Sequence, residues 1–131
     1  MEMRIGIDTN RYRDFCAGDP VSVETFALAD AIFVPFTVVA ELRAGFLCGR
    51  ISRQNESVLL RFLNRSRVRV LFADEQTTHQ YARIFFQLRS QGTPIPTNDM
   101  WIAALVLQHE LLLYSRDRHF DCLPQLPRIG E

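Results

Sequence analysis

Four carboxylates stand at places in the sequence from which they could reach one crevice. Asp8 ends an apolar segment near the N-terminus, and Glu41 lies about one turn into a predicted helix. Asp99 stands in the first turn of an apolar helix, and Asp117 follows another apolar run by two residues.

Carboxylates gathered in this way favour the chemistry of a divalent cation. Two carboxylates about 5 Å apart repel by roughly 3 kcal/mol at an effective dielectric constant near 20, so a pocket with four of them requires protons or cations. Hard divalent cations prefer oxygen ligands, and Mg²⁺ or Mn²⁺ is the natural choice. Such a cluster activates water and stabilises charge on a phosphoryl group, which indicates phosphodiester hydrolysis.

Three of these acids also have plain structural explanations when taken singly. Asp99 is the only charged residue between Arg89 and Glu110, yet an acid in the first turn also interacts favourably with a helix dipole. Asp8 could form a turn at a strand end, and Asp117 could lie in a solvated loop. The interpretation as a site therefore depends on all four acids meeting at one place.

Glu41 shares a helical stripe with small and apolar residues, namely Val38, Ala44, Gly45 and Cys48. We therefore expect its side chain to project toward the apolar side of its helix, where an unpaired carboxylate is costly. An arginine or a metal ion could balance that charge.

Alternating apolar strands and amphipathic helices must position these acids. Apolar runs predict strands at 4–8, 31–35, 68–72 and 111–115, with a short fifth at 126–129. Unbroken apolar strands separated by helices are typical of a parallel sheet covered on both faces, so we predict a three-layer α/β/α domain with four or five parallel strands. Ligands bind such sheets at the carboxyl ends of the strands. We expect residues 1–131 to form a single domain of this kind.

Capping residues indicate where the helices begin. Asp19, followed by proline, and Asp74 predict two helix starts. Thr37 is expected to cap the helix that carries Glu41. Thr97 or Asn98 is expected to cap the helix that carries Asp99.

Composition excludes several kinds of function. Fifteen basic and fifteen acidic side chains give a formal net charge of zero, which argues against a general polyanion binder. Every basic residue is arginine, which excludes phosphate-binding loops, Schiff-base catalysis and receiver domains, all of which need a lysine. Three separated cysteines support neither a zinc knuckle nor a disulfide framework. No signal peptide or membrane span is indicated, so we expect a cytoplasmic protein.

Four segments together resemble a known family. They are IDTN with Asp8, AELRAG with Glu41, TNDMWIAA with Asp99 and LLYSRDRHFDCLPQL with Asp117. In order and spacing they are similar to the motifs of PIN-domain ribonucleases, and specifically of the VapC-type toxins of bacterial toxin–antitoxin pairs. The resemblance implies a Mg²⁺-dependent endoribonuclease in which these four acids are catalytic and hold the metal, and it implies a cognate antitoxin protein as partner.

The resemblance also implies roles for two neighbours of the acids, because Thr9 and Asn98 occupy polar positions that would orient carboxylates. The expected RNA-binding residues are four arginines in predicted loops at the active edge: Arg11, Arg13, Arg116 and Arg118. Ordinary surface arginine, or a counter-ion for an acid, is the alternative for each. Ten phenylalanines are many for this length, so some are expected to be exposed for the antitoxin or for a homodimer.

Three other functions compete with this interpretation. A catalytically silent PIN-like binding module would keep the fold without the reaction. A metal phosphatase of another α/β family lacks support, because DTN rather than DxD follows the first strand and no lysine is present. A metal-free ribonuclease would use His79, His109 and His119, of which only His119 lies near an acid motif, where we expect a loop histidine.

Overall fold

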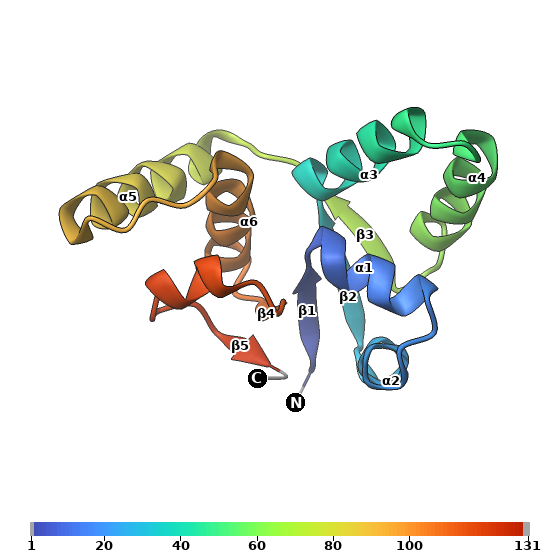
Figure 1. Ribbon diagram of the computed structural model, residues 1–131. Helices are drawn as coiled ribbons and strands as arrows, with labels where there is room; N and C mark the ends of the chain where they lie inside the picture. The colour runs from blue at the N-terminus through green and yellow to red at the C-terminus, as the bar shows by residue number, and fades with distance from the viewer. Residues whose placement is uncertain (1, 130–131) are drawn as a thin grey trace.

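The computed structural model describes residues 2–129 and contains one five-stranded sheet in that range (Figure 1). The strands are β1 (Arg4–Ile7), β2 (Ala31–Pro35), β3 (Val68–Leu71), β4 (Leu112–Tyr114) and β5 (Arg128–Ile129). They lie in the order β3-β2-β1-β4-β5, and every neighbouring pair is parallel. The predicted parallel sheet is confirmed, including its short fifth strand.

Helices cover both faces of this sheet. They are α1 (Thr9–Cys16), α2 (Pro20–Leu28), α3 (Phe36–Cys48), α4 (Ser52–Leu63), α5 (Glu75–Gln91) and α6 (Thr97–Gln108), with a short 3₁₀ helix, η1 (Arg118–Cys122). Figure 1 shows α5 and α6 on one side of the sheet, and α1, α2 and α4 on the other, with α3 beyond the carboxyl end of β2. This arrangement confirms the three-layer α/β/α fold.

One part of the core sits between the central strands and α6. Ile5 and Ile7 of β1 and Leu113 of β4 are fully buried, as is Leu105 of α6. Six of the twelve residues of α6 are buried, which explains why the sequence of this helix is almost continuously apolar. A helix buried on most of its surface has its orientation fixed by packing, so its first turn is held firmly against the edge of the sheet.

The first helix, α1, was not predicted. Its sequence, TNRYRDFC, is largely polar, and Asp8 begins it by accepting a hydrogen bond from the backbone N–H of Arg11. Aromatic packing stabilises it instead, because the Phe15 ring stacks on Phe26 at a centroid distance of 4.4 Å. The expectation that Arg11 and Arg13 lie in a loop is therefore wrong, since both belong to α1.

Helix caps follow the prediction at two places and depart from it at two others. Asp19 caps α2, and Asp74 caps α5 in a reciprocal capping box. The predicted caps of α3 and α6 are wrong, because these helices begin directly after Pro35 and Pro96 with no side-chain cap. Proline holds φ near −60° with an extended ψ, so the chain enters each helix before the predicted cap, two positions earlier at α3.

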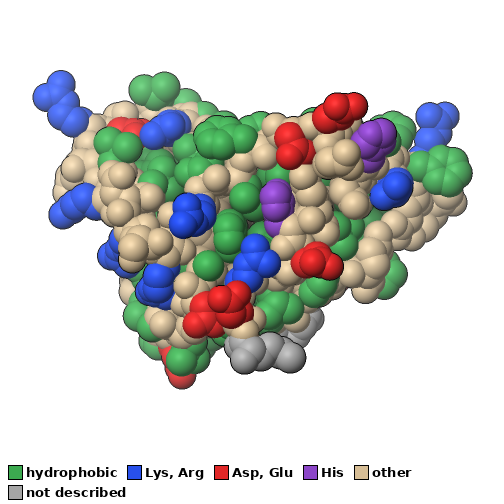
Figure 2. Space-filling model, turned by 180° about the vertical axis from the view of Figure 1, so that it is seen from behind, with side chains coloured by type: hydrophobic (Ala, Val, Ile, Leu, Met, Phe, Trp, Pro, Cys, Tyr) green, Lys and Arg blue, Asp and Glu red, His purple; other side chains and the backbone are tan. Residues whose placement is uncertain are grey.

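Charged side chains of both signs are dispersed over the surface. Figure 2 shows one face on which arginines and acids alternate with apolar side chains, so that face carries no large field of one sign. Within residues 2–129, the helices are too short or too polar to cross a membrane.

Truncating Leu42 tests how firmly α3 is attached to the core. Leu42 is fully buried, whereas Leu47 on the same helix is 80% exposed. We expect Leu42→Ala to lower the free energy of unfolding by about 2–5 kcal/mol, because it leaves a cavity. Leu47→Ala is the matched control and should change stability by less than about 0.5 kcal/mol. Urea denaturation measures both changes in the free energy of unfolding. Equal losses in the two variants would contradict the packing of α3 against the core through Leu42.

Candidate active site

Four elements bring the predicted acids to the carboxyl edge of the sheet. Asp8 directly follows β1, and Asp117 follows β4, whose Tyr114 is in register with Ile7 of β1. Asp99 stands in the first turn of α6, and Glu41 lies on α3, which follows β2. Since β1 lies between β2 and β4, all four acids approach from neighbouring elements.

The charges of these acids act on one another. Burial raises the pKa of Asp8, and the charge of Asp117 raises it further. Burial also raises the pKa of Asp99, and the charges of Asp117 and Glu41 add to that effect. The four acids are therefore linked through their charges, with Asp117 acting on both Asp8 and Asp99.

Asp8 is the most deeply buried of the four, with 5% of its surface exposed. The hydroxyl of Ser115 donates to its Oδ2 at 2.5 Å, and the backbone N–H of Arg11 donates to its Oδ1 at 2.9 Å. The same Ser115 hydroxyl accepts from the backbone N–H of Asp117 at 3.0 Å. These bonds favour the charged form of Asp8 and partly offset the effect of burial on its pKa. Ser115 thus links two of the predicted acids.

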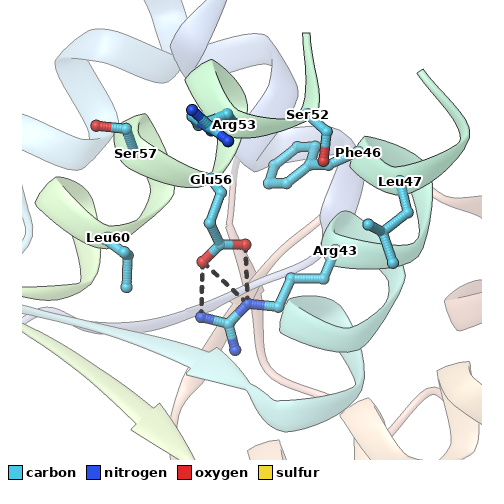
Figure 3. Close-up of a pocket in the computed structure, with 8 residues that line it drawn as sticks. All are labelled: Arg43, Phe46, Leu47, Ser52, Arg53, Glu56, Ser57 and Leu60. Carbon is cyan, nitrogen blue, oxygen red and sulfur yellow. Dashed lines mark hydrogen bonds and ion pairs between the residues drawn. The ribbon is translucent and has the colours of Figure 1, made fainter. Parts of the chain in front are cut away.

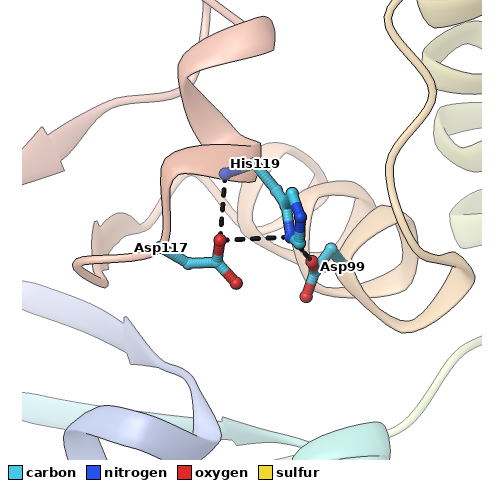
Figure 4. A group of neighbouring side chains, drawn as sticks. All are labelled: Asp99, Asp117 and His119. Carbon is cyan, nitrogen blue, oxygen red and sulfur yellow. Dashed lines mark hydrogen bonds and ion pairs between the residues drawn. The ribbon is translucent and has the colours of Figure 1, made fainter.

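Asp99 and Asp117 are joined by a histidine (Figure 4). The ring Nδ1 of His119 lies 2.8 Å from Asp99 Oδ2 and 3.1 Å from Asp117 Oδ1. The backbone N–H of His119 also donates to Asp117 Oδ1 at 2.9 Å. The hydrogen bond with Asp99 is the main reason that the pKa of His119 is raised.

Glu41 differs from its predicted orientation. It is exposed, and the buried face of α3 consists of Thr37, Val38, Val39 and Leu42 instead. The small residues that share its stripe, Ala44, Gly45 and Cys48, are exposed as well. Within residues 2–129 no arginine pairs with Glu41, so its predicted arginine partner is not found. Glu41 lies at the rim of the acid group and acts on Asp99 through its charge.

The two polar neighbours differ in their surroundings. Thr9 begins α1 beside Asp8, and its buried Oγ1 has no hydrogen-bond partner among the described residues. Asn98 is exposed in the first turn of α6. Neither side chain hydrogen-bonds to an acid within residues 2–129, so a role in orienting carboxylates stays a prediction.

The four predicted RNA-binding arginines differ in exposure and in partners. Arg11 is only 8% exposed, and its guanidinium carbon lies 4.1 Å from the centre of the Tyr114 ring, so it supports the site from within. Arg116 is exposed and forms a two-pronged pair with Asp14, at 3.0 and 3.2 Å. Arg13 on α1 and Arg118 in η1 are exposed.

Sequence reasoning missed Ser115 and undervalued His119. Ser115 ends the predicted fourth strand two residues before Asp117, and His119 follows Asp117 by two. A hydroxyl at a buried strand end beside an acid, and a histidine within one tight turn of an acid, are the signals that could have found them. Their contacts with Asp8 and Asp99 join residues 107 and 20 positions apart, which no local pattern reveals.

The donor atoms at this site fit a divalent cation. One oxygen each from Asp99 and Asp117 and one nitrogen of His119 all lie within 4.8 Å of one another. Burial raises the pKa of Asp99, the charges of Asp117 and Glu41 raise it further, and a cation would relieve that repulsion. The unpartnered hydroxyl of Thr9 beside Asp8 is a further polar atom suited to water near an ion.

A hollow lies elsewhere, between α3 and α4 (Figure 3). It has a volume of about 720 Å³ and is lined by Arg43, Phe46, Leu47, Ser52, Arg53, Glu56, Ser57 and Leu60. Arg43 makes a two-pronged ion pair with Glu56 there. None of the four predicted acids contributes to its lining, so we treat this groove separately from the candidate site.

An α/β/α domain with acids at the carboxyl edge of a parallel sheet belongs to the class of α/β proteins that place their functional site at the ends of the strands. Residues 7–125 match the family model of the PIN domain. The chain therefore belongs to the PIN-domain family, as its motifs predicted.

Individual relatives agree with this assignment. The chain is 31% identical over 90 residues to "Ribonuclease VapC1" of Haemophilus influenzae (strain R2866), covering 67% of this chain and 64% of that protein. It superposes with a TM-score of 0.83 and 25% identity on VapBC2 from Rickettsia felis bound to a DNA fragment, covering 97% and 98% of the two chains. VapBC-5 from Mycobacterium tuberculosis, of the VapBC family of toxin–antitoxin systems, has a TM-score of 0.73 and 23% identity, with 96% of this chain and 98% of that chain covered.

Replacing Ser115 by alanine should cost more stability at high pH than at low pH. The hydroxyl stabilises charged Asp8, so its loss raises the folded-state pKa of Asp8 while the unfolded-state pKa is unchanged. When the folded-state pKa of an acid is raised, the protein loses stability as the pH rises from the unfolded-state pKa to the folded-state pKa. We expect a loss of about 1–3 kcal/mol at pH 8 and a smaller loss at pH 4, measured by urea denaturation.

Ser22→Ala is the matched control for that experiment. Ser22 is also fully buried, but its hydroxyl bonds to the Tyr114 hydroxyl and not to a carboxylate. The loss of unfolding free energy in Ser22→Ala should be the same at pH 4 and pH 8. If the loss in Ser115→Ala is also independent of pH, the link between Ser115 and charged Asp8 is contradicted.

Replacing Asp99 by asparagine should stabilise the metal-free protein at pH 7.5. Burial raises the folded-state pKa of Asp99, so ionising this group costs stability as the pH rises above its unfolded-state value. We expect a gain of about 1 kcal/mol, or roughly 4 °C in Tm, in thermal unfolding with a chelator present. Glu24→Gln, at an exposed acid on α2, is the control and should leave Tm unchanged. A lower Tm for Asp99→Asn would show that the site is not under electrostatic strain.

Proposed function

We propose that this chain is a divalent-metal-dependent endoribonuclease and the toxin of a toxin–antitoxin pair. The observation that carries the proposal is the electrostatic grouping of Asp8, Glu41, Asp99 and Asp117 in a chain of the PIN-domain family. The relative from Haemophilus influenzae that is called a ribonuclease supports the substrate class. Mg²⁺ is the proposed ion, with Mn²⁺ as a substitute, and residues 1–131 are proposed to act as a single PIN-like domain.

In the proposed mechanism the acids have distinct tasks. Asp8, Asp99 and Asp117 would hold the ion, directly or through water. The ion, when bound, lowers the pKa of bound water and neutralises charge on the phosphoryl group. Ser115 keeps Asp8 and the backbone of Asp117 in fixed positions. Glu41, exposed at the rim, would complete the site as a ligand or orient the attacking water. Hydrolysis would leave a 5′-phosphate and a 3′-hydroxyl.

RNA is proposed to reach the site along exposed arginines beside it. Arg13 and Arg118 are exposed, and Arg118 immediately follows Asp117. Arg116 is already bound to Asp14 and would contribute only by exchanging that carboxylate for a phosphate. Arg11 is buried against Tyr114 and is not proposed as an RNA contact.

An antitoxin is the proposed occupant of the groove between α3 and α4. That groove exposes Leu47 and Leu60, and arginines of α3 and α4 lie along it. Such a surface suits an amphipathic segment with acidic side chains. The similar structures that are complexes of toxin–antitoxin systems support this partner. Phe85 and Phe86, exposed on α5, are the surface proposed for a homodimer.

Cleavage assays with purified protein test the proposed reaction. We expect structured RNA to be cut with Mg²⁺ or Mn²⁺ and not with a chelator. Asp8→Asn, Asp99→Asn and Asp117→Asn should each reduce the rate roughly 100-fold, because each removes a ligand charge. Asp30→Asn is the matched control, since Asp30 bonds to the backbone N–H of Met3 at the opposite edge of the sheet.

Three outcomes would count against the proposal. Cleavage that persists in the chelator would exclude the metal mechanism. Variants that cut as fast as Asp30→Asn would exclude the assigned acids. Binding of RNA without cleavage under either ion would favour the catalytically silent module.

A further inference from the structure

His119 occupies the centre of the acid group, and the proposed mechanism gives it no task. Its side chain is 49% exposed, yet its Nδ1 faces the carboxylates of Asp99 and Asp117 (Figure 4). Because the backbone N–H of the same residue bonds to Asp117 Oδ1, main chain and ring are both fixed on this acid. A solvent-facing loop histidine would not be held at two points in this way.

The distances around Nδ1 are those of neighbouring ligands on one ion. In an octahedral shell with bonds of about 2.1 Å, adjacent ligand atoms lie roughly 3.0 Å apart. Nδ1 lies 2.8 Å from the Asp99 oxygen and 3.1 Å from the Asp117 oxygen. All three atoms fall within 4.8 Å of one another, so they lie close enough to converge on a common ion.

We propose that His119 is a metal ligand through Nδ1, together with Asp99 and Asp117, and that this nitrogen shifts the preference of the centre from Mg²⁺ toward Mn²⁺. Mg²⁺ binds almost entirely through oxygen, whereas imidazole nitrogen suits first-row transition ions. An otherwise carboxylate centre that includes one imidazole therefore gains more affinity for Mn²⁺ than for Mg²⁺. The inference rests on the proposed function, because it concerns the same metal centre.

The competing account makes His119 a positioning residue. In that account its ring N–H only bridges the two carboxylates and never contacts the ion. Its loss would then weaken the binding of Mn²⁺ and Mg²⁺ by the same factor, since the carboxylates would be equally misplaced for both ions. The ratio of the two affinities, and the presence of a nitrogen bonded to the ion, therefore separate the two accounts.

The experiment measures metal binding directly on the whole chain. Binding of Mn²⁺ is followed by the loss of the free-ion EPR signal, and Mg²⁺ by competition, for the wild type and for His119→Asn. Asparagine keeps the side chain polar and places an oxygen at a similar reach to Nδ1. His79→Asn is the matched control, because His79 is exposed on α5 and remote from the acids. Pulsed EPR of the Mn²⁺ complexes detects coupling to ¹⁴N.

We expect His119→Asn to lower the ratio of Mn²⁺ to Mg²⁺ affinity roughly tenfold and to abolish the ¹⁴N coupling. His79→Asn should retain the wild-type ratio and the coupling. An unchanged ratio in His119→Asn, or no ¹⁴N coupling in the wild type, would overturn the assignment of His119 as a ligand.

Two further variants distinguish failure of this inference from failure of the proposed function. Asp99→Asn and Asp117→Asn should each weaken the binding of both ions. If they do so while His119→Asn leaves the ratio of Mn²⁺ to Mg²⁺ affinity unchanged, the proposed metal centre is supported and only the ligand role of His119 is wrong. If neither variant weakens binding, both the proposed metal centre and the role of His119 are wrong.

Discussion

Repulsion among buried carboxylates is the constraint around which the site is organised. Asp8 and Asp99 both have raised pKa values, chiefly because they are buried, and the charge of Asp117 acts on both. The fold holds these groups together with neutral donors, namely the Ser115 hydroxyl and the backbone N–H of Arg11, and with the ring of His119. Hydrogen bonds from neutral donors stabilise individual carboxylates without adding positive charge, so the acid group remains suited to the proposed cation.

Packing of the central elements supplies the rigidity that this arrangement needs. The register of β1 with β4 sets Asp8 opposite Ser115, and α6 is buried along most of its length. A helix fixed in this way cannot rotate Asp99 out of the site to relieve repulsion. The stability gained from the hydrophobic core therefore offsets the electrostatic repulsion among the acids. Such compensation is common where function requires strained groups.

The sequence predicted those features that depend on local pattern. Apolar runs located the strands, and the acids that follow β1 and β4 were placed because strand ends in a parallel sheet share one edge. Features that depend on partners distant in sequence were missed. Helix α1 is polar and depends on the stacking of Phe15 against Phe26, and Glu41 faces solvent because α3 packs through Val38 and Leu42. The contact of His119 with Asp99 depends on where η1 meets α6, which no periodicity encodes.

The arginine-only composition is explained largely by structure. Planar guanidinium groups make two-pronged contacts that an ammonium cannot, and Arg43 with Glu56 and Arg116 with Asp14 are bound in this way. Arg67 donates to the backbone carbonyls of Phe26 and Ala29. Because these arginines are engaged in structural contacts, the proposed RNA contacts fall to other arginines at the rim, such as Arg13 and Arg118. In the proposed reaction the acids would repel a phosphate until a cation neutralised them, so ion binding would precede productive binding of RNA.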